Sequence, residues 1–240
     1  MKTALIVLLL GLTQIKTACA WGWKELGEEA STPVTTSARN VLIVGTALTL
    51  SVLIFEDQII DVVQEETVEN KPLGGWSKYG DLAGQMVPNG LYVLGQGIAG
   101  ISGNVKGYQR ALGMFKATAY AASVTTVLKY TIREPRPNNP QEKNSFPSGH
   151  TTTAFAFSGY VFAEHGWLWG IPAMGISLLS GFSRINDNRH FLHDVLAGAT
   201  IGFAYGVGIS KFQNSDQKLS FMIVPIYDQD LRGLAFQKDI

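Results

Sequence analysis

Six apolar runs, separated by polar or proline-containing stretches, are distributed over residues 41–210 of this 240-residue chain. Charged residues make up 16% of it, below the roughly 25% of ordinary soluble domains. This predicts an all-α fold, a helical bundle with about six core helices, and it favours a membrane-embedded bundle because six runs with so little charge exceed what a soluble core needs. Buried helices of a soluble bundle would show a similar pattern, and several runs are shorter than the roughly 20 residues of a membrane span. The runs are Val41–Phe55, Leu82–Ser102, Tyr108–Leu128, Thr151–Ala163, Trp167–Phe182 and Val195–Ser210.

Residues 1–20 have the features of a secretory signal peptide. Lys2 supplies a positive start, Ala4–Leu10 is uninterrupted apolar sequence, and Ala18-Cys19-Ala20 is a small-x-small cleavage site. An uncleaved anchor helix is the alternative. Cleavage would remove Cys19, the only cysteine, so we expect neither a disulfide nor a thiol nucleophile in the mature chain.

The rest of the chain divides into three parts. We expect an irregular lead-in over 21–40, a helical domain over 41–212 and a C-terminal tail over 213–240. Within the tail, Leu219–Tyr227 and Leu231–Phe236 are rich in β-favouring residues, which predicts a small β-hairpin. An extended tail fits the same sequence.

The charge balance gives no reason to expect nucleic acid as a partner. Lysine plus arginine is 19 and aspartate plus glutamate is 19, so the formal net charge is zero. A nucleic-acid-binding domain usually carries a basic excess.

Three short blocks carry the chemistry. The loops that hold them are separated by two predicted helices, and a helical hairpin returns the chain to the side that it left. We therefore expect all three at the same end of the bundle. They are Lys129-x6-Arg136-Pro137, Pro147-Ser148-Gly149-His150 and Ser183-Arg184-x5-His190-x3-Asp194.

The first and third blocks supply cations for an anion. Arg136 lies between two prolines, which restrict its backbone, and Arg184 adds a second guanidinium. A guanidinium matches phosphate oxygens as a planar fork, whereas Lys129 offers a point charge. Taken alone, the first block is equally typical of a basic helix end that faces water or lipid headgroups.

The second block reads as the start of a helix. Ser148 is a candidate N-cap, and the free N–H groups and dipole of a helix start favour an anion. Gly149 allows close approach of the backbone. His150 would then stand beside a bound phosphate, suited to protonate a leaving oxygen. A simple cap with a surface histidine is the alternative.

The third block predicts an oriented nucleophile. His190 and Asp194 are four residues apart and share a helix face, so the carboxylate can accept a proton from one ring nitrogen and leave the other as a lone pair. Small residues continue this face and permit close helix contact. Successive residues of a helix point about 100° apart, which turns His193 off the face that His190 and Asp194 share, so we interpret it as accessory or structural. The small residues are Gly198, Gly202 and Gly206.

A metal site is the rival interpretation of the histidines. His190 and His193 with Asp187 or Asp194 could hold zinc. The clustered lysine and arginine side chains would repel a cation, so we expect no metal and no other cofactor.

At these residues the chain resembles the type 2 phosphatidic acid phosphatase superfamily, over about 66 residues from Lys129 to Asp194. The resemblance implies an all-helical bundle. It implies His190 as the nucleophile that forms a phosphohistidine, Asp194 as its partner and His150 as the acid for the leaving group. It implies a phosphate cradle made of Lys129, Arg136, Ser148, Gly149 and Arg184.

We therefore expect a metal-independent phosphatase that hydrolyses a lipid phosphate monoester or diphosphate. The expected partners are a phosphorylated lipid and the membrane. The expected place is the bacterial cell envelope, in the inner membrane with the site facing the periplasm. A soluble periplasmic non-specific acid phosphatase, a vanadate-dependent haloperoxidase and a non-catalytic membrane scaffold are the alternatives. Which lipid is cleaved, and how often the chain crosses the membrane, stay open.

Overall fold

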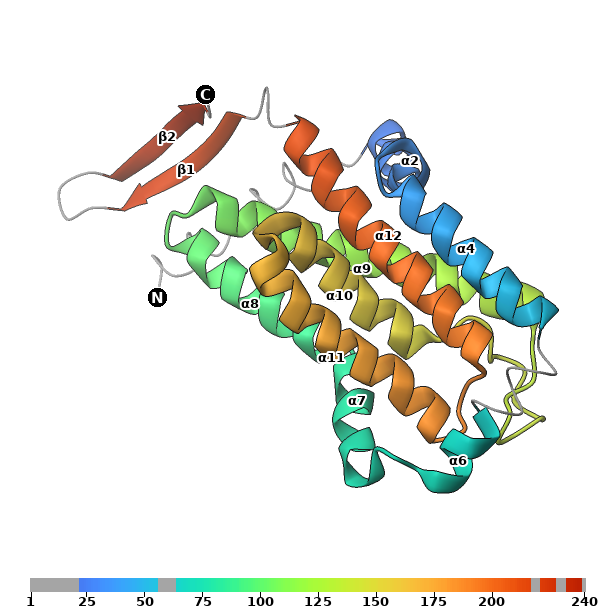
Figure 1. The fold of residues 1–240 in the computed structure, drawn as a ribbon. Coiled ribbons are helices and arrows are strands. Elements are labelled where there is room, and N and C mark those ends of the chain that lie inside the picture. Colours follow the sequence, from blue (N-terminus) through green and yellow to red (C-terminus); the bar gives the residue numbers. More distant parts are fainter. Residues whose placement is uncertain (1–21, 56–63, 217–220, 228–231, 239–240) are drawn as a thin grey trace. The chain divides into compact units, whose positions relative to one another are not determined.

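The computed structural model describes residues 22–55, 64–216, 221–227 and 232–238 (Figure 1). The predicted signal peptide, residues 1–20, lies outside this part of the chain. Contacts divide the chain into one compact unit that ends at Ser31 and another that begins at Thr32. All elements from Thr32 onward belong to the second unit, which carries the candidate site.

The six predicted apolar runs correspond to six helices, and the all-α prediction is confirmed. A two-stranded sheet is the only β-structure in the described residues. The helices are α4 (Arg39–Ile54), α8 (Val87–Ile101), α9 (Val105–Ile132), α10 (Gly149–His165), α11 (Trp167–Asn186) and α12 (Leu192–Asp216).

The expected irregular lead-in over 21–40 is wrong. It contains α2 (Trp23–Ala30), α3 (Thr32–Thr35) and the start of α4. In α2 the sequence supplies an i,i+4 pair, with Lys24 Nζ 3.7 Å from Glu28 Oε1, and such pairs support short helices. The low hydrophobicity of this stretch concealed its helical content.

The segment before α8 is also largely helical. It holds α6 (Glu66–Asn70), the 3₁₀ turn η2 (Gly74–Trp76) and α7 (Ser77–Gly84). Pro72 and the two glycines that follow do form a turn, but the helix resumes at Ser77. Helix α7 is short and packs on α11, so tertiary contact supports it more than its own sequence does.

Helix α10 is the centre of the bundle. It packs against α9, α11 and α12, while α8 covers α9 and α4 covers α12 (Figure 1). Its side chains are almost continuously buried from Thr151 to Val161. A helix buried on all sides loses the amphipathic pattern, which is why its sequence reads as a plain apolar run.

Glycines let α12 approach α10 closely, as the spacing of Gly198, Gly202 and Gly206 predicts. A Cβ atom on Gly198 would lie 2.5 Å from the carbonyl oxygen of Ser148, and one on Gly206 would lie 2.5 Å from the backbone nitrogen of Tyr160. No side chain fits at those distances. The contact holds the first turn of α12 against the first turn of α10, where the second and third sequence blocks lie.

The outer faces of several helices are apolar and exposed. Ile98 on α8 is 65% exposed, and Ile43 on α4 is also 65% exposed. Among the described helices only α12, over Leu192–Ser215, is long and apolar enough to cross a membrane, and 61% of that stretch is buried by other helices. Core helices of soluble proteins pass the same test, so this helix alone carries little weight.

The tail forms the predicted hairpin. Strands β1 (Phe221–Tyr227) and β2 (Arg232–Lys238) pair antiparallel, with Val224 opposite Ala235. The connection between them lies outside the described residues.

Candidate active site

The chain forms a long irregular loop between α9 and α10 because α9 is stopped abruptly. Arg133 takes a left-handed conformation, φ 55°, and its N–H still bonds the carbonyl of Lys129 at 3.2 Å. Pro135 and Pro137 then prevent further helix. Two backbone bonds close the loop on itself, Ser145 N–H to Glu134 O at 2.9 Å and Arg136 N–H to Glu142 O at 3.0 Å.

The structure brings the three blocks to the same end of the bundle. The ends of α9 and α11 and the starts of α10 and α12 lie together there (Figure 1). A direct bond joins the second and third blocks, since the Ser148 N–H donates to the backbone carbonyl of Asp194 at 3.0 Å.

His190 and Asp194 form a buried pair. His190 is 2% exposed and Asp194 is fully buried. The ring Nδ1 lies 3.3 Å from Asp194 Oδ2, and the same oxygen accepts from the Ser145 hydroxyl at 2.6 Å and from the Phe191 N–H at 2.9 Å. With Nδ1–H directed to the carboxylate, Nε2 carries the lone pair.

Burial lowers the pKa of His190 below its ordinary value. The Asp194 carboxylate opposes this shift, and the charges of Lys129 and Arg136 add to it. The ring is therefore neutral at neutral pH, which is the form that can attack phosphorus.

The cations of the first block hold the loop that covers the buried pair. Lys129 Nζ donates to the carbonyl oxygens of Asn144 at 2.5 Å and Ser145 at 3.0 Å. Arg136 Nε donates to Asn144 Oδ1 at 2.7 Å and lies 3.2 Å from Glu142 Oε2. Both side chains therefore shape the site as well as charging it.

The start of α10 keeps its backbone donors available. Ser148 is the N-cap residue, as predicted, but its side chain caps no helix N–H. Its hydroxyl accepts instead from Thr151 Oγ1 at 2.9 Å. A Cβ atom on Gly149 would lie 3.8 Å from Cε of Lys129, so the lysine stem runs beside the helix start. Unsatisfied N–H groups next to an ammonium are suited to an anion.

Arg184 and His150 meet at a residue that the sequence did not reveal. Asp81, on α7, lies 2.6 Å from Arg184 Nη1 and 3.3 Å from His150 Nε2, through the same carboxylate oxygen. Arg184 itself is 5% exposed and is also 3.9 Å from Asp187.

All eight predicted site residues thus lie in one region, although their catalytic roles stay predictions. Sequence reasoning missed Asp81, Ser145 and Glu134. Ser145 and Glu134 lie within the stretch of sequence that the three blocks cover. The only sequence signal that could have identified them is their polar character close to a predicted phosphate-binding cation. Asp81 lies far upstream of the blocks, directly before the apolar run Leu82–Ser102.

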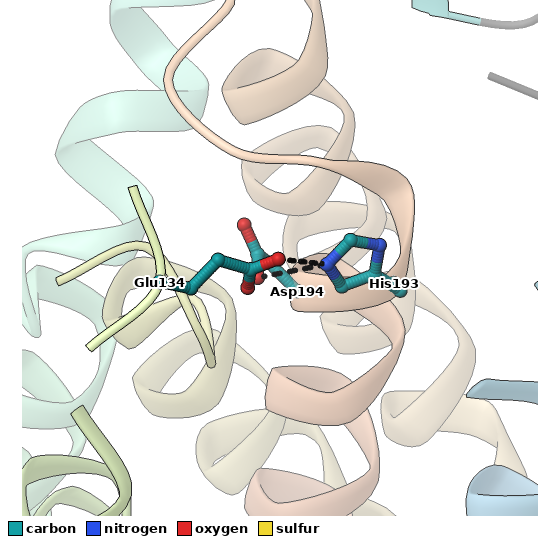
Figure 2. A group of neighbouring side chains, drawn as sticks. All are labelled: Glu134, His193 and Asp194. Carbon is teal, nitrogen blue, oxygen red and sulfur yellow. Dashed lines mark hydrogen bonds and ion pairs between the residues drawn. The ribbon is translucent and has the colours of Figure 1, made fainter. Parts of the chain in front are cut away.

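A second cluster lies behind the buried pair. His193 Nε2 is 2.9 Å from Glu134 Oε1 and 3.6 Å from Asp194 Oδ1 (Figure 2). One ligand atom from each of these residues lies within 4.8 Å of the others, so within the described part of the chain this is the group that could hold a metal ion, and it differs from the zinc set considered from sequence. The Glu134–His193 pair also fits the structural role predicted for His193.

A cavity of about 310 Å³ opens beside the site. Lys129, Gly149 and His150 line one side, and both polar and apolar side chains line the rest. The rest of the wall comes from the α7–α8 connection and from α9, including Met86 and Ala122.

Comparison with known families and proteins agrees with this geometry. A family model described as the PAP2 superfamily matches residues 110–218. A Bacillus subtilis undecaprenyl-diphosphatase, BcrC, is 31% identical over 146 residues, covering 60% of this chain and 69% of that protein.

Two lipid A phosphatases match over shorter stretches. A lipid A 1-phosphatase of Porphyromonas gingivalis is 37% identical over 40% of this chain, and a lipid A 4′-phosphatase of Helicobacter pylori is 30% identical over 36% of it. The matched stretches span only 21% and 42% of those relatives' own lengths.

The fold has a solved counterpart. A transmembrane PAP2-type phosphatidylglycerolphosphate phosphatase from Bacillus subtilis superposes with a TM-score of 0.56 at 21% identity. The match covers 78% of this chain and 98% of that one.

Proposed function

Because this chain belongs to the PAP2 superfamily, we propose that it is a metal-independent phosphatase that hydrolyses a lipid phosphate monoester or diphosphate through a phosphohistidine. One observation carries the proposal. The neutral imidazole of His190 is oriented by the buried carboxylate of Asp194, at 3.3 Å, within the field of Lys129 and Arg136.

In the first step the phosphate binds at the start of α10, among the cations of the site. The Nε2 lone pair of His190 attacks phosphorus in line, a P–N bond forms, and the bond to the leaving oxygen breaks. His150 gives its proton to that oxygen. Asp194 stabilises the positive charge that develops on the His190 ring, and the cations stabilise the equatorial oxygens.

In the second step water attacks the phosphohistidine. His150, now neutral, takes a proton from the water as the new P–O bond forms and the P–N bond breaks. Inorganic phosphate leaves, and both histidines return to their starting protonation states. The same group thus acts as acid and then as base, as microscopic reversibility requires.

A lipid substrate is supported by the relatives and by the surface. The names of the lipid A phosphatases and of the undecaprenyl-diphosphatase state that those proteins act on lipid-linked phosphates. The cavity beside His150, with Met86 and Ala122 in its wall, offers space for the part of a lipid next to its phosphate. The exposed apolar faces of α4 and α8 would contact bilayer lipid.

The corresponding location is the inner membrane of a bacterial envelope, with the site facing the periplasm. The catalytic groups lie at the end of the bundle, so we place them outside the stretch that is embedded in lipid. A signal peptide over residues 1–20 would direct the chain to this compartment.

The test is a phosphate-release panel on the purified protein in detergent, with phosphatidic acid, phosphatidylglycerol phosphate, undecaprenyl diphosphate, lipid A and soluble phosphomonoesters. His190→Ala is the blank. His165→Ala is the matched control, because this histidine lies at the opposite end of α10, bonded to the Tyr92 hydroxyl at 2.7 Å.

We expect release from at least one lipid by the wild type and the control, and none above background by the blank. Phosphate release that persists in His190→Ala would end the proposed mechanism. Extraction of the active protein by osmotic shock without detergent would instead favour a soluble periplasmic phosphatase.

A further inference from the structure

Helix α7 packs directly against the site at two glycines. A Cβ atom on Gly80 would lie 2.6 Å from the carbonyl oxygen of Leu179 on α11. One on Gly84 would lie 2.5 Å from Cβ of His150. Asp81 stands between these contacts, so its carboxylate is set at a fixed place beside the catalytic groups.

The Asp81 carboxylate joins the two sides of the site. Its Oδ1 lies 2.6 Å from Arg184 Nη1 and 3.3 Å from His150 Nε2, and its Oδ2 accepts from Gln85 Nε2 at 2.7 Å. Asp81 is 37% exposed and His150 is 35% exposed. The Nε2 atom of His150 is therefore directed to a carboxylate, and Nδ1 is the nitrogen left to exchange a proton with substrate and water.

Most of the surroundings of His150 oppose its protonation. Burial, and then the charge of Arg184 from α11, lower the pKa of His150 to about 4, and His190 and Arg136 from the neighbouring loops act in the same direction. Lys129 of α9 lines the same cavity. Among the described groups that act on this ring, Asp81 alone favours the protonated form.

We propose that Asp81 is a positioning residue that holds Nε2–H of His150 and keeps the imidazolium available as the acid for the leaving group. The proposal rests on the phosphatase function proposed above. In each turnover Nδ1–H of His150 passes to the leaving oxygen while Nε2–H stays with Asp81. The substrate phosphate adds further negative charge that favours the same protonated state. The proton then returns to Nδ1 from the attacking water.

The test is the pH dependence of kcat for Asp81→Asn, measured as phosphate release in detergent from the best lipid of the panel. A carboxamide is the same size but carries no charge, so the imidazolium loses its stabilising partner. We expect kcat at pH 7.5 to fall about tenfold and the basic limb of the profile to move to lower pH by about one unit, the lower end of the effect of one close opposite charge.

Asp187→Asn is the matched control. Asp187 also faces Arg184, at 3.9 Å, and accepts from Ser77 Oγ at 2.5 Å, but Asp81 is the carboxylate that contacts His150. The basic limb of the kcat–pH profile of Asp187→Asn should stay at the wild-type pH. A role confined to neutralising Arg184 would move both profiles alike.

Orthovanadate inhibition separates a second alternative. If Asp81 merely competes with phosphate for Arg184, Asp81→Asn would bind vanadate more tightly with undiminished kcat, and this result would overturn the proposal. So would an unchanged basic limb in a variant that elutes and melts like the wild type. Asp81→Glu, which keeps the charge, serves if the asparagine variant does not fold, and it should retain the wild-type limb. Failure of the wild type to release phosphate would count against the proposed function, not against the role of Asp81 alone.

Discussion

Two of the histidine–carboxylate pairs at the site have the same separation and very different surroundings. In the buried pair, His190 and Asp194, the side chains are 3% and 0% exposed. In the open pair, His150 and Asp81, they are 35% and 37% exposed. Both pairs have a nitrogen–oxygen distance of 3.3 Å. The contact distance therefore does not explain why His190 and His150 have different proposed roles.

Burial is what divides them. A buried ring whose partner is fixed by Ser145 and Phe191 has one orientation and one tautomer, which suits a nucleophile. A ring that reaches solvent can exchange a proton with water in every cycle, which suits an acid and base. We infer that the two pairs are specialised by their access to water.

The largest expected effect follows from disabling the buried pair. Asp194→Asn would present an amide to Nδ1 and favour the tautomer that removes the Nε2 lone pair. We expect kcat to fall by about 10³-fold or more, against about tenfold for Asp81→Asn. Steady-state phosphate release from the two purified variants decides this, with circular dichroism as the check on folding. Equal losses in both variants would show that the two pairs are not specialised.

A second test sharpens the role of the open pair. His150→Ala should lose about 10²-fold in kcat on a lipid phosphate, whose alkoxide leaves poorly without a proton. On p-nitrophenyl phosphate, whose leaving group needs no acid, the loss should be less than about tenfold. The ratio of the two losses is the measurement. Losses independent of the leaving group would remove His150 from the acid role.

The acid limb of the pH profile reports on the buried pair. Burial lowers the pKa of His190, so the ring stays neutral, and able to attack, to a pH below the ordinary histidine range near 6.5. We expect kcat/KM for the lipid substrate to hold as the pH falls through that range and to drop only at more acidic values. An acid limb at or above pH 6.5 would mean that burial does not lower the pKa of His190.

The smallest expected effect concerns the cluster behind the buried pair. If Glu134, His193 and Asp194 hold no metal that the reaction requires, dialysis against EDTA should change kcat less than twofold, a difference of about 0.4 kcal/mol or less in the barrier. Metal analysis of the purified protein by mass spectrometry is the companion measurement. Strict loss of activity that zinc restores would contradict the metal-free mechanism.

Much of this site could be predicted because many of its residues lie in short helical segments, where sequence spacing fixes their relative positions. His190 and Asp194 are one helical turn apart, and the Ser148–His150 stretch opens a helix, so local geometry nearly determines what each can do. The same holds for the glycine stripe of α12, whose spacing already implies a close helix contact.

The missing parts come from tertiary contacts. Asp81 lies on a short helix. The position of this helix depends on the close contacts of Gly80 with α11 and of Gly84 with α10, and no local sequence pattern predicts those contacts. The helix α2 was missed for a different reason. Its residues are mostly polar, so it contains no apolar run of the kind that identified the six core helices.

The hydrogen bonds of the Lys129 side chain have a consequence for how the proposed phosphatase would respond to its substrate. An ammonium has three N–H donors, and two of them already bond the carbonyl oxygens of Asn144 and Ser145. One remains for an incoming phosphate. Ser145 in turn donates its hydroxyl to Asp194 at 2.6 Å. In the proposed mechanism, a phosphate that binds this lysine would therefore also act, through Ser145, on the carboxylate that orients His190, so substrate binding and activation of the proposed nucleophile would be linked by one chain of hydrogen bonds.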